Sequence, residues 1–253
     1  HEFILNTPAM ELLGINKNEF SSLEADEHLA NFDDGHFSER GAIVVLPKLM
    51  QVFADPTKLM QGLQKTREYL HSNGITVIGN PGSMHNQNLQ TAKNLIFGGI
   101  DSPFESYFFP SALNLTEQFE LNEILDAAKA QTSWGAGKLN YLSQHIKLFA
   151  DGAMYSQNMV MRDGYLDNHQ GSWLMNLDTF ENLFKIFWDD GYQIHIHQNG
   201  DAGLDRLLVT LEKNLANNPR ADHRTTVVHF GYSAKDQLKK MKELGVIVSA
   251  NPY

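Results

Sequence analysis

The stretch that decides the fold is Tyr192–Asp201, with the sequence YQIHIHQNGD. Apolar and polar side chains alternate along its first six residues, as in a β-strand with one buried face. The apolar face carries Tyr192, Ile194 and Ile196, and the polar face carries Gln193, His195 and His197. Gly200 and Asp201 then lead into an amphipathic helix, which we expect from about Asp201 to Asn217.

Strand and helix patterns alternate along much of the chain. We predict strands near residues 75–79, 106–109, 145–149, 192–197, 225–229 and 246–249. We predict helices near residues 53–73, 90–97, 116–131, 178–190, 201–217 and 234–244. Six strand–helix units imply a parallel sheet with helices packed against it. Residues 79–82 lack the glycine-rich phosphate turn of many open sheets, so we predict an α/β fold, an incomplete (β/α)₈ TIM-like barrel.

We expect two parts in the chain. Residues 1–55 are predicted to be an inserted, loop-rich segment, in which residues 15–42 are acidic and irregular. Residues 56–253 are predicted to be the strand–helix units of the barrel, truncated at both ends. The loop 153–176 is long enough to act as a lid, or it packs its aromatic side chains onto the barrel.

The composition excludes several classes of function. The 253 residues include 20 Lys and Arg against 30 Asp and Glu, and this net charge of −10 argues against a nucleic-acid partner. No run of about 18 apolar residues indicates a membrane span. Cysteine is absent, which excludes disulfides, thiolate ligands and a cysteine nucleophile. Any bound metal must therefore be held by nitrogen and oxygen atoms.

Polar residues gather where predicted strands end, which is where parallel barrels place their sites. Three strand ends stand out: Lys147 with Asp151, His197 with Asp201, and His229. Histidines that end two consecutive strands suit a divalent metal such as Zn²⁺. A metal there lowers the pKa of its bound water and polarises a carbonyl group, which favours hydrolysis.

Four motifs, in this order, resemble the amidohydrolase superfamily. They are IKLFADGA at 146–153, HQNGD at 197–201, RTTVVH at 224–229 and LGVIVSANP at 244–252. The likeness is greatest to the branch that contains N-substituted formamide deformylases and related metal-dependent hydrolases. Residues 1–15 and 70–76 also resemble that branch, so the resemblance covers nearly the whole chain.

The resemblance implies a distorted (β/α)₈ barrel of the metal-dependent hydrolase type. It implies that His197 and His229 are metal ligands from the fifth and sixth strands. Lys147 matches the position where some relatives carry a carboxylated lysine that bridges two metals. The His-x-His pair of the family is expected before His1 and its catalytic aspartate after Tyr253, so we expect the chain to be a fragment.

The metal-ligand candidates also have structural interpretations. His197 and His229 are either ligands or strand-end histidines bonded to loop carbonyls. Lys147 either reaches a metal or forms an ion pair with Asp151 or another inward acid. His195 shares the face of His197 but lies one layer deeper, so we expect it to support the ligands rather than to bind metal.

Four further residues are candidates for contacts to the ligands or the substrate. Asp201 supports the site or simply caps the helix that follows Gly200. Asp151 supports the site or only forms a turn with Gly152. Tyr155 and Arg162, in the loop 153–176, are expected to face the ligands or the substrate.

We expect the full-length protein to cleave a C–N bond, amide or formamide-like, in a small-molecule substrate with metal-activated water. The 253-residue chain alone is expected to be inactive, with its metal absent or weakly held. The alternative is a non-catalytic binding or regulatory barrel with a degenerate metal site. We expect no nucleic-acid or membrane partner, self-association through exposed sheet edges, and a cytoplasmic location, with export left open.

Overall fold

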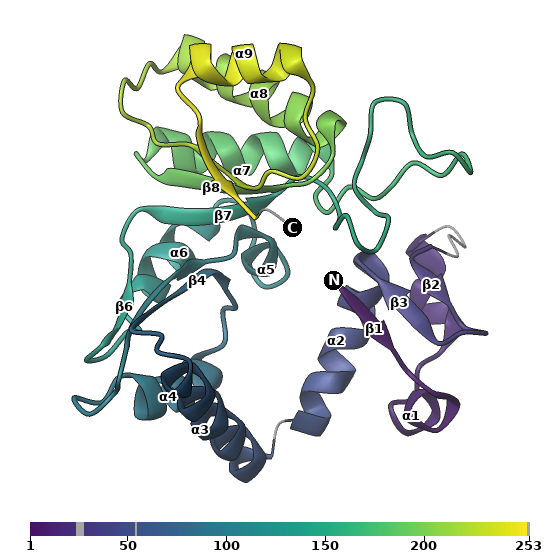
Figure 1. Cartoon of the computed structure of the whole chain (residues 1–253), viewed down its shortest axis with the longest axis vertical. Helices are drawn as coiled ribbons and strands as arrows, with labels where there is room; N and C mark the ends of the chain where they lie inside the picture. Colours follow the sequence, from purple (N-terminus) through teal and green to yellow (C-terminus); the bar gives the residue numbers. More distant parts are fainter. Residues whose placement is uncertain (24–27, 54, 252–253) are drawn as a thin grey trace.

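The computed structural model describes residues 1–23, 28–53 and 55–251. Parallel strands and helices alternate from residue 56 onward in a mixed α/β fold, and all six predicted strands are present. An N-terminal segment, residues 1–53, lies beside this alternating part (Figure 1). None of the helices in the described ranges is both long and apolar enough to span a bilayer.

The larger sheet contains four parallel strands in the order β10-β9-β8-β7. They are β7 (His145–Phe149), β8 (Gln193–Gln198), β9 (Thr226–His229) and β10 (Ile247–Ala250). The register pairs Phe149 with His197 and Gln198 with His229. The carboxyl ends of β7, β8 and β9 therefore lie side by side.

A second parallel sheet has the order β4-β5-β6. Its strands are β4 (Val77–Ser83), β5 (Glu105–Pro110) and the unpredicted β6 (Leu139–Tyr141). A single parallel bridge between Ser111 and Lys147 links the end of β5 to β7. The two sheets do not close on each other within the described residues, so the fold shown is an α/β structure with two open parallel sheets.

The larger sheet is covered by α7 (Leu177–Asp189), α8 (Asp201–Asn217) and α9 (Lys235–Leu244), as Figure 1 shows. Ile194 and Ile196 of β8 are completely buried in the main core, together with Leu204 and Leu207 of α8. This confirms the alternation predicted for β8. Because the apolar side chains fill one face of β8, His195 and His197 lie on the opposite face, where they contact other side chains.

The remaining helices of the α/β part are α3 (Pro56–Ser72), α4 (Gln87–Phe97), α5 (Ala112–Thr116) and α6 (Ile124–Thr132). The continuous helix predicted at 116–131 is wrong. Ser111 caps α5 and Glu123 bonds the backbone N–H of Glu120, so two short helices flank a turn. The helix α7 also begins slightly before the predicted residue 178, because the side chain of Asn176 forms its N-cap.

The N-terminal segment has its own small core. Its elements are β1 (Glu2–Ile4), α1 (Thr7–Leu12), the 3₁₀ helix η1 (Lys17–Leu23), β2 (Ala30–Asn31), β3 (His36–Ser38) and α2 (Arg40–Phe53). The loop predicted over 15–42 is thus wrong in part, because η1, β2, β3 and the start of α2 lie within it. Phe20, Phe37 and Val45 are buried together. Pro47 and the β-branched run before it hid α2 from the sequence pattern.

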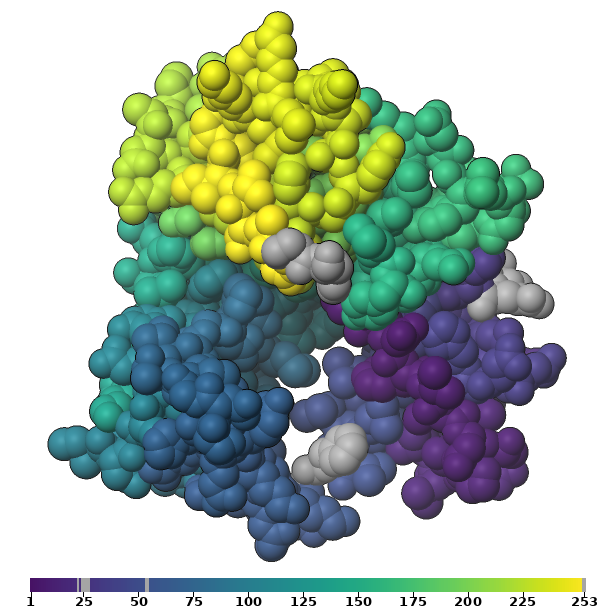
Figure 2. Space-filling model, viewed as in Figure 1, coloured from purple at the N-terminus to yellow at the C-terminus, as the bar shows by residue number. Residues whose placement is uncertain are grey.

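The loop that leaves β7, residues 150–176, reaches across to the N-terminal segment (Figure 1). The side chain of Asn158 donates to Ser38 Oγ, and the backbone N–H of Ala153 donates to Glu39. A hollow separates the N-terminal segment from α3 and α4 on the face drawn in Figure 2. The N-terminal segment is therefore held mainly at the β7 side of the molecule.

Candidate functional site

Three nitrogen-bearing side chains meet near the carboxyl ends of β7, β8 and β9. The ring centroids of His197 and His229 are 4.5 Å apart. Lys147 lies on β7, and its charge contributes to lowering the pKa of both histidines. His197 and Lys147 are buried, and His229 is partly buried. The structure thus brings together the three residues that the sequence suggested as metal ligands.

The backbone at the end of β9 is strained. His229 has a φ of 75° and Phe230 a φ of 52°, both in the left-handed region that non-glycine residues rarely occupy. Two such residues in succession cost free energy that the surrounding structure must offset. Strain of this kind clusters at functional sites, and here it turns the chain directly at the second histidine.

Both histidines are uncharged at neutral pH. Burial is the main cause: it lowers the pKa of His197 well below its usual range and that of His229 to about 4. Nε2 of His197 lies 3.0 Å from the amide nitrogen of Asn199, and Nδ1 of His229 lies 3.2 Å from that of Asn251. An amide nitrogen donates, so each ring nitrogen accepts through its lone pair.

The alternative interpretation of His197, a strand-end histidine bonded to a loop carbonyl, is also met in part. His197 has a hydrogen bond with the backbone of Gly152. A metal-bound histidine commonly donates its other ring N–H to a carbonyl, which fixes the tautomer. Since the lone pair of Nε2 accepts from Asn199, this amide would have to move aside for a metal to bind that nitrogen.

Lys147 is a buried amine without a counter-ion. Burial alone lowers its pKa to about 7, and no hydrogen bond or ion pair of its Nζ occurs within the described ranges. The Nζ atom lies 5.7 Å from the ring centroid of Phe149. The predicted ion pair with Asp151 is not formed, because both oxygens of Asp151 accept backbone N–H groups instead.

Asp151 joins the loop after β7 to the loop after β8. Its Oδ1 accepts the N–H of Asn199 at 3.0 Å, and its Oδ2 accepts those of Val160 at 2.9 Å and Gly200 at 2.7 Å. Burial raises the pKa of Asp151 to about 7, while these donors act in the opposite direction. Asp151 is thus more than a turn residue: it fixes the segment that follows His197.

Asp201 of α8 and Arg162 of the loop after β7 belong to a network that ties this loop to α8 and α9. Asp201 is the first residue of α8 and not its N-cap, which is Gly200; its Oδ1 accepts the N–H of Arg162 at 2.9 Å. The guanidinium of Arg162 binds the carboxylates of Asp205 and Asp236, at 2.6 and 2.9 Å. These partners occupy Arg162, so the structure places it in the attachment of the loop and not beside the histidines.

His1 lies beside His197 and is held by Glu39, and neither residue was a candidate from the sequence. The ring of His1 lies 5.0 Å from that of His197, and its Nδ1 is 3.0 Å from a carboxylate oxygen of Glu39. The ring of Tyr155, a predicted site residue, lies 5.8 Å from the ring of His1. Glu39 is buried, and burial raises its pKa. The sequence offered only an acidic run at 33–39 as a signal for it.

His195 is paired with a histidine at the start of the neighbouring strand. Its Nε2 lies 3.0 Å from Nδ1 of His145, and its ring is 4.5 Å from that of Phe109. Burial, followed by the charges of His145 and Lys147, lowers the pKa of His195 to about 3. His195 therefore lies on the same face as His197 but has its own partner.

This lowered pKa predicts acid-sensitive stability. Between pH 6.5 and 3 the unfolded chain binds a proton at His195 and the folded chain does not, so folding stability falls as the pH falls. From pH 7 to pH 5 the loss from this residue is about 1 to 2 kcal/mol. In urea denaturation at both pH values, His195→Gln is expected to lose less stability on acidification than the wild type by that amount. His71→Gln, at an exposed position on α3, is the control; equal losses for His195→Gln and the wild type would contradict the assignment.

A second group of potential cation ligands lies at the surface. His28, Asp167 and His169 have ligand atoms within 4.8 Å of one another. The rings of His28 and His169 stack at 4.1 Å, and Nε2 of His169 is 2.7 Å from the carbonyl oxygen of Gln157. Within the described ranges, this is the one group of at least three histidines and acids whose ligand atoms lie that close together. No third histidine or acid therefore joins His197 and His229 within 4.8 Å.

The structure resembles two solved hydrolases. An uncharacterized metal-dependent hydrolase from Pyrococcus horikoshii OT3 matches with a TM-score of 0.65 and 17% identity, over 99% of this chain and 46% of that one. A second, from Pyrococcus furiosus, matches with a TM-score of 0.62 and 18% identity, over 99% and 48%. The chain thus spans about half the length of these proteins, and at such identities the likeness shows the fold.

The sequence comparison identifies the family. No curated protein sequence matches the chain. The sequence profile of the amidohydrolase family, in contrast, matches residues 1–253, which is the entire chain. The strand-end histidines and the parallel sheets accordingly belong to a member of the amidohydrolase family.

Proposed function

We propose that the protein is a metal-dependent hydrolase that cleaves an amide-like or formamide-like C–N bond in a small molecule. The observation that carries the proposal is the convergence of two neutral histidines and one buried lysine on neighbouring strands; among the described residues this lysine has no ion pair. A divalent metal such as Zn²⁺ binds histidine through its uncharged form, so the two neutral rings are suited to it. Family membership and the solved metal-dependent hydrolases support the reaction class.

Each residue of the proposed site would have a separate role. His197 and His229 would hold the metal, which when bound lowers the pKa of a coordinated water and polarises the substrate carbonyl. Lys147 would contribute its neutral amine, or the carboxylated form found in some relatives. Asp151 orients the backbone after His197 through Asn199 and Gly200. The arrangement fits an incomplete (β/α)₈ barrel, of which the two open sheets would be parts.

The ligand set would need further residues. Zinc sites in hydrolases commonly have three protein ligands, and the described residues add no third histidine or carboxylate to His197 and His229. We therefore propose that the His-x-His pair and the aspartate expected from the family resemblance complete the site in the full-length protein. The non-catalytic alternative predicts that the same protein binds no stoichiometric metal.

Lys147 provides the test that separates a functional role from a structural one. Methionine has a similar length and no charge, so Lys147→Met removes a buried amine to which the described residues give no hydrogen bond or ion pair. We expect the free energy of unfolding to stay unchanged or to rise by about 1 kcal/mol. Metal-dependent hydrolysis by the full-length protein should nevertheless fall by roughly 10- to 100-fold or more, because the site loses one of its donors.

The matched control for this test is Lys93→Met. Lys93 lies on α4 over the ring of Phe108, at 5.0 Å from the ring centroid, and burial likewise lowers its pKa. Its replacement should leave hydrolysis and metal content unchanged. Full activity of Lys147→Met, measured as kcat/KM beside metal content, would remove Lys147 from the proposed site.

A further inference from the structure

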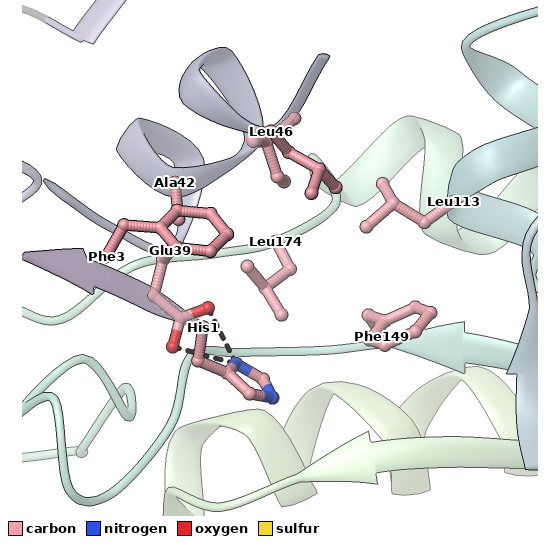
Figure 3. A pocket seen from close by; sticks show the side chains of 9 residues that line it. His1, Phe3, Glu39, Ala42, Leu46, Leu113, Phe149 and Leu174 are labelled. Carbon is pink, nitrogen blue, oxygen red and sulfur yellow. Dashed lines mark hydrogen bonds and ion pairs between the residues drawn. The ribbon is translucent and has the colours of Figure 1, made fainter. Parts of the chain in front are cut away.

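An apolar cavity of about 170 Å³ lies between the N-terminal segment and β7 (Figure 3). One wall consists of Phe3 of β1 with Ala42 and Leu46 of α2. The facing wall consists of Leu113 of α5, Phe149 of β7 and Leu174. Leu46, Leu113 and Leu174 are only half-buried although they are large and apolar, so the cavity lacks the contacts that would complete its packing.

The cavity adjoins the strand-end histidines. His1 lines the cavity, and its ring is 5.0 Å from the ring of His197. Phe149 also lines the cavity, with its ring 5.7 Å from His197 and 5.7 Å from Nζ of Lys147. A molecule whose reacting group lay at His197 would therefore lie next to this cavity.

The polar end of the cavity is already satisfied by protein groups. The carboxylate of Glu39 accepts from the N–H of Ala153 at 2.7 Å and from Ser156 Oγ at 3.1 Å. It also pairs with Nδ1 of His1, as the dashed lines in Figure 3 show. Glu39 has little capacity left to attract a cationic or strongly polar group, because these donors use its oxygens.

We propose that this cavity is the specificity pocket of the site and takes an apolar, phenyl-sized group of the amide substrate. The proposal rests on the proposed function for the identity of the reacting group. An engineered apolar cavity of about 150 Å³ holds benzene, so the volume here suits a phenyl or branched aliphatic group. The N-terminal segment thus supplies selectivity, while the strand ends supply the chemistry.

Binding by the metal-free protein tests the pocket separately from hydrolysis. After removal of metal with EDTA, calorimetry of the full-length protein should show that phenylacetamide binds at least tenfold more tightly than acetamide. Leu46→Trp and Leu113→Trp fill the cavity from opposite walls and should each abolish this preference. Leu95→Trp, at an exposed position on α4, should preserve it. Circular dichroism confirms that the variants fold, and the second wall keeps the test valid if one variant does not.

The outcomes are distinguishable. Equal affinities for the two amides, or a preference that persists in both filled variants, would overturn the pocket even if the metal-loaded protein hydrolyses amides. A phenyl preference that both filled variants lose would support the pocket. If that preference held but the metal-loaded protein hydrolysed neither an N-phenylacetyl nor an N-acetyl amine, the proposed function would fail and the pocket would remain a site for apolar amides.

Discussion

His197→Ala is expected to remove stoichiometric metal and to lower kcat/KM by at least about 10³-fold. His197 is buried beside His229 and Lys147, and burial keeps its ring neutral at physiological pH. Alanine leaves a space that a water molecule can fill, but it supplies no imidazole lone pair. The loss should therefore appear in metal content and in turnover together.

The control is His71→Ala on α3, where the side chain is exposed to solvent. Metal content should be measured by inductively coupled plasma mass spectrometry after exhaustive dialysis, beside kcat/KM for an amide substrate. His71→Ala should match the wild type in both. If His197→Ala retained metal and turnover, the strand-end site would not be the catalytic centre. If the wild-type protein held no metal, the non-catalytic alternative would be preferred.

The largest effect on stability is expected from Asp151→Ala. This change leaves three buried backbone N–H groups without their acceptor, those of Val160, Asn199 and Gly200. An unsatisfied buried donor costs about 1 to 3 kcal/mol, and water entering the space recovers part of this. We expect the free energy of unfolding to fall by about 3 kcal/mol or more.

The measurement is urea denaturation at pH 8, above the raised pKa of Asp151, where the carboxylate is ionised and its hydrogen bonds are charge-assisted. Asp151→Asn retains one acceptor oxygen but turns an NH₂ group toward backbone donors, so its loss should be intermediate. Asp163→Ala, at an exposed position in the same loop, should change stability by less than about 0.5 kcal/mol. A loss below 1 kcal/mol for Asp151→Ala would show that these bonds are replaceable.

The strands were predictable because their signals are local. Alternation in β8 and the β-branched run of β9 are visible in the sequence, and burial of Ile194 and Val227 confirms the faces. Local signals failed where tertiary packing or a turn intervened. The three-residue strand β6 is too short for a pattern, and α2 contains Pro47. The division of 116–131 into α5 and α6 depends on the turn at Glu120 to Glu123.

The proximity of three candidate site residues was predictable from the strands. His197 and His229 lie at the carboxyl ends of β8 and β9, and Lys147 lies in the middle of the adjacent strand β7, so a correct strand prediction was enough to place them close together. His1 and its partner Glu39 belong to a different part of the chain, and His1 contacts His197 only through the docking of the N-terminal segment. No periodicity in one segment encodes such a contact. The ion pairs of Arg162 were not predictable for a related reason. Its partners Asp205 and Asp236 come from helices that the loop reaches only in the fold.

The contact of the N-terminal segment with the loop 150–176 has an evolutionary consequence. Glu39 holds this loop through Ala153 and Ser156, while α2 turns Ala42 and Leu46 toward the cavity. Mutations in α2 can therefore reshape one wall without altering the register of β7, β8 and β9. In the proposed function, substrate range can drift under selection through residues 40–53, while the strands that carry the histidines stay constrained.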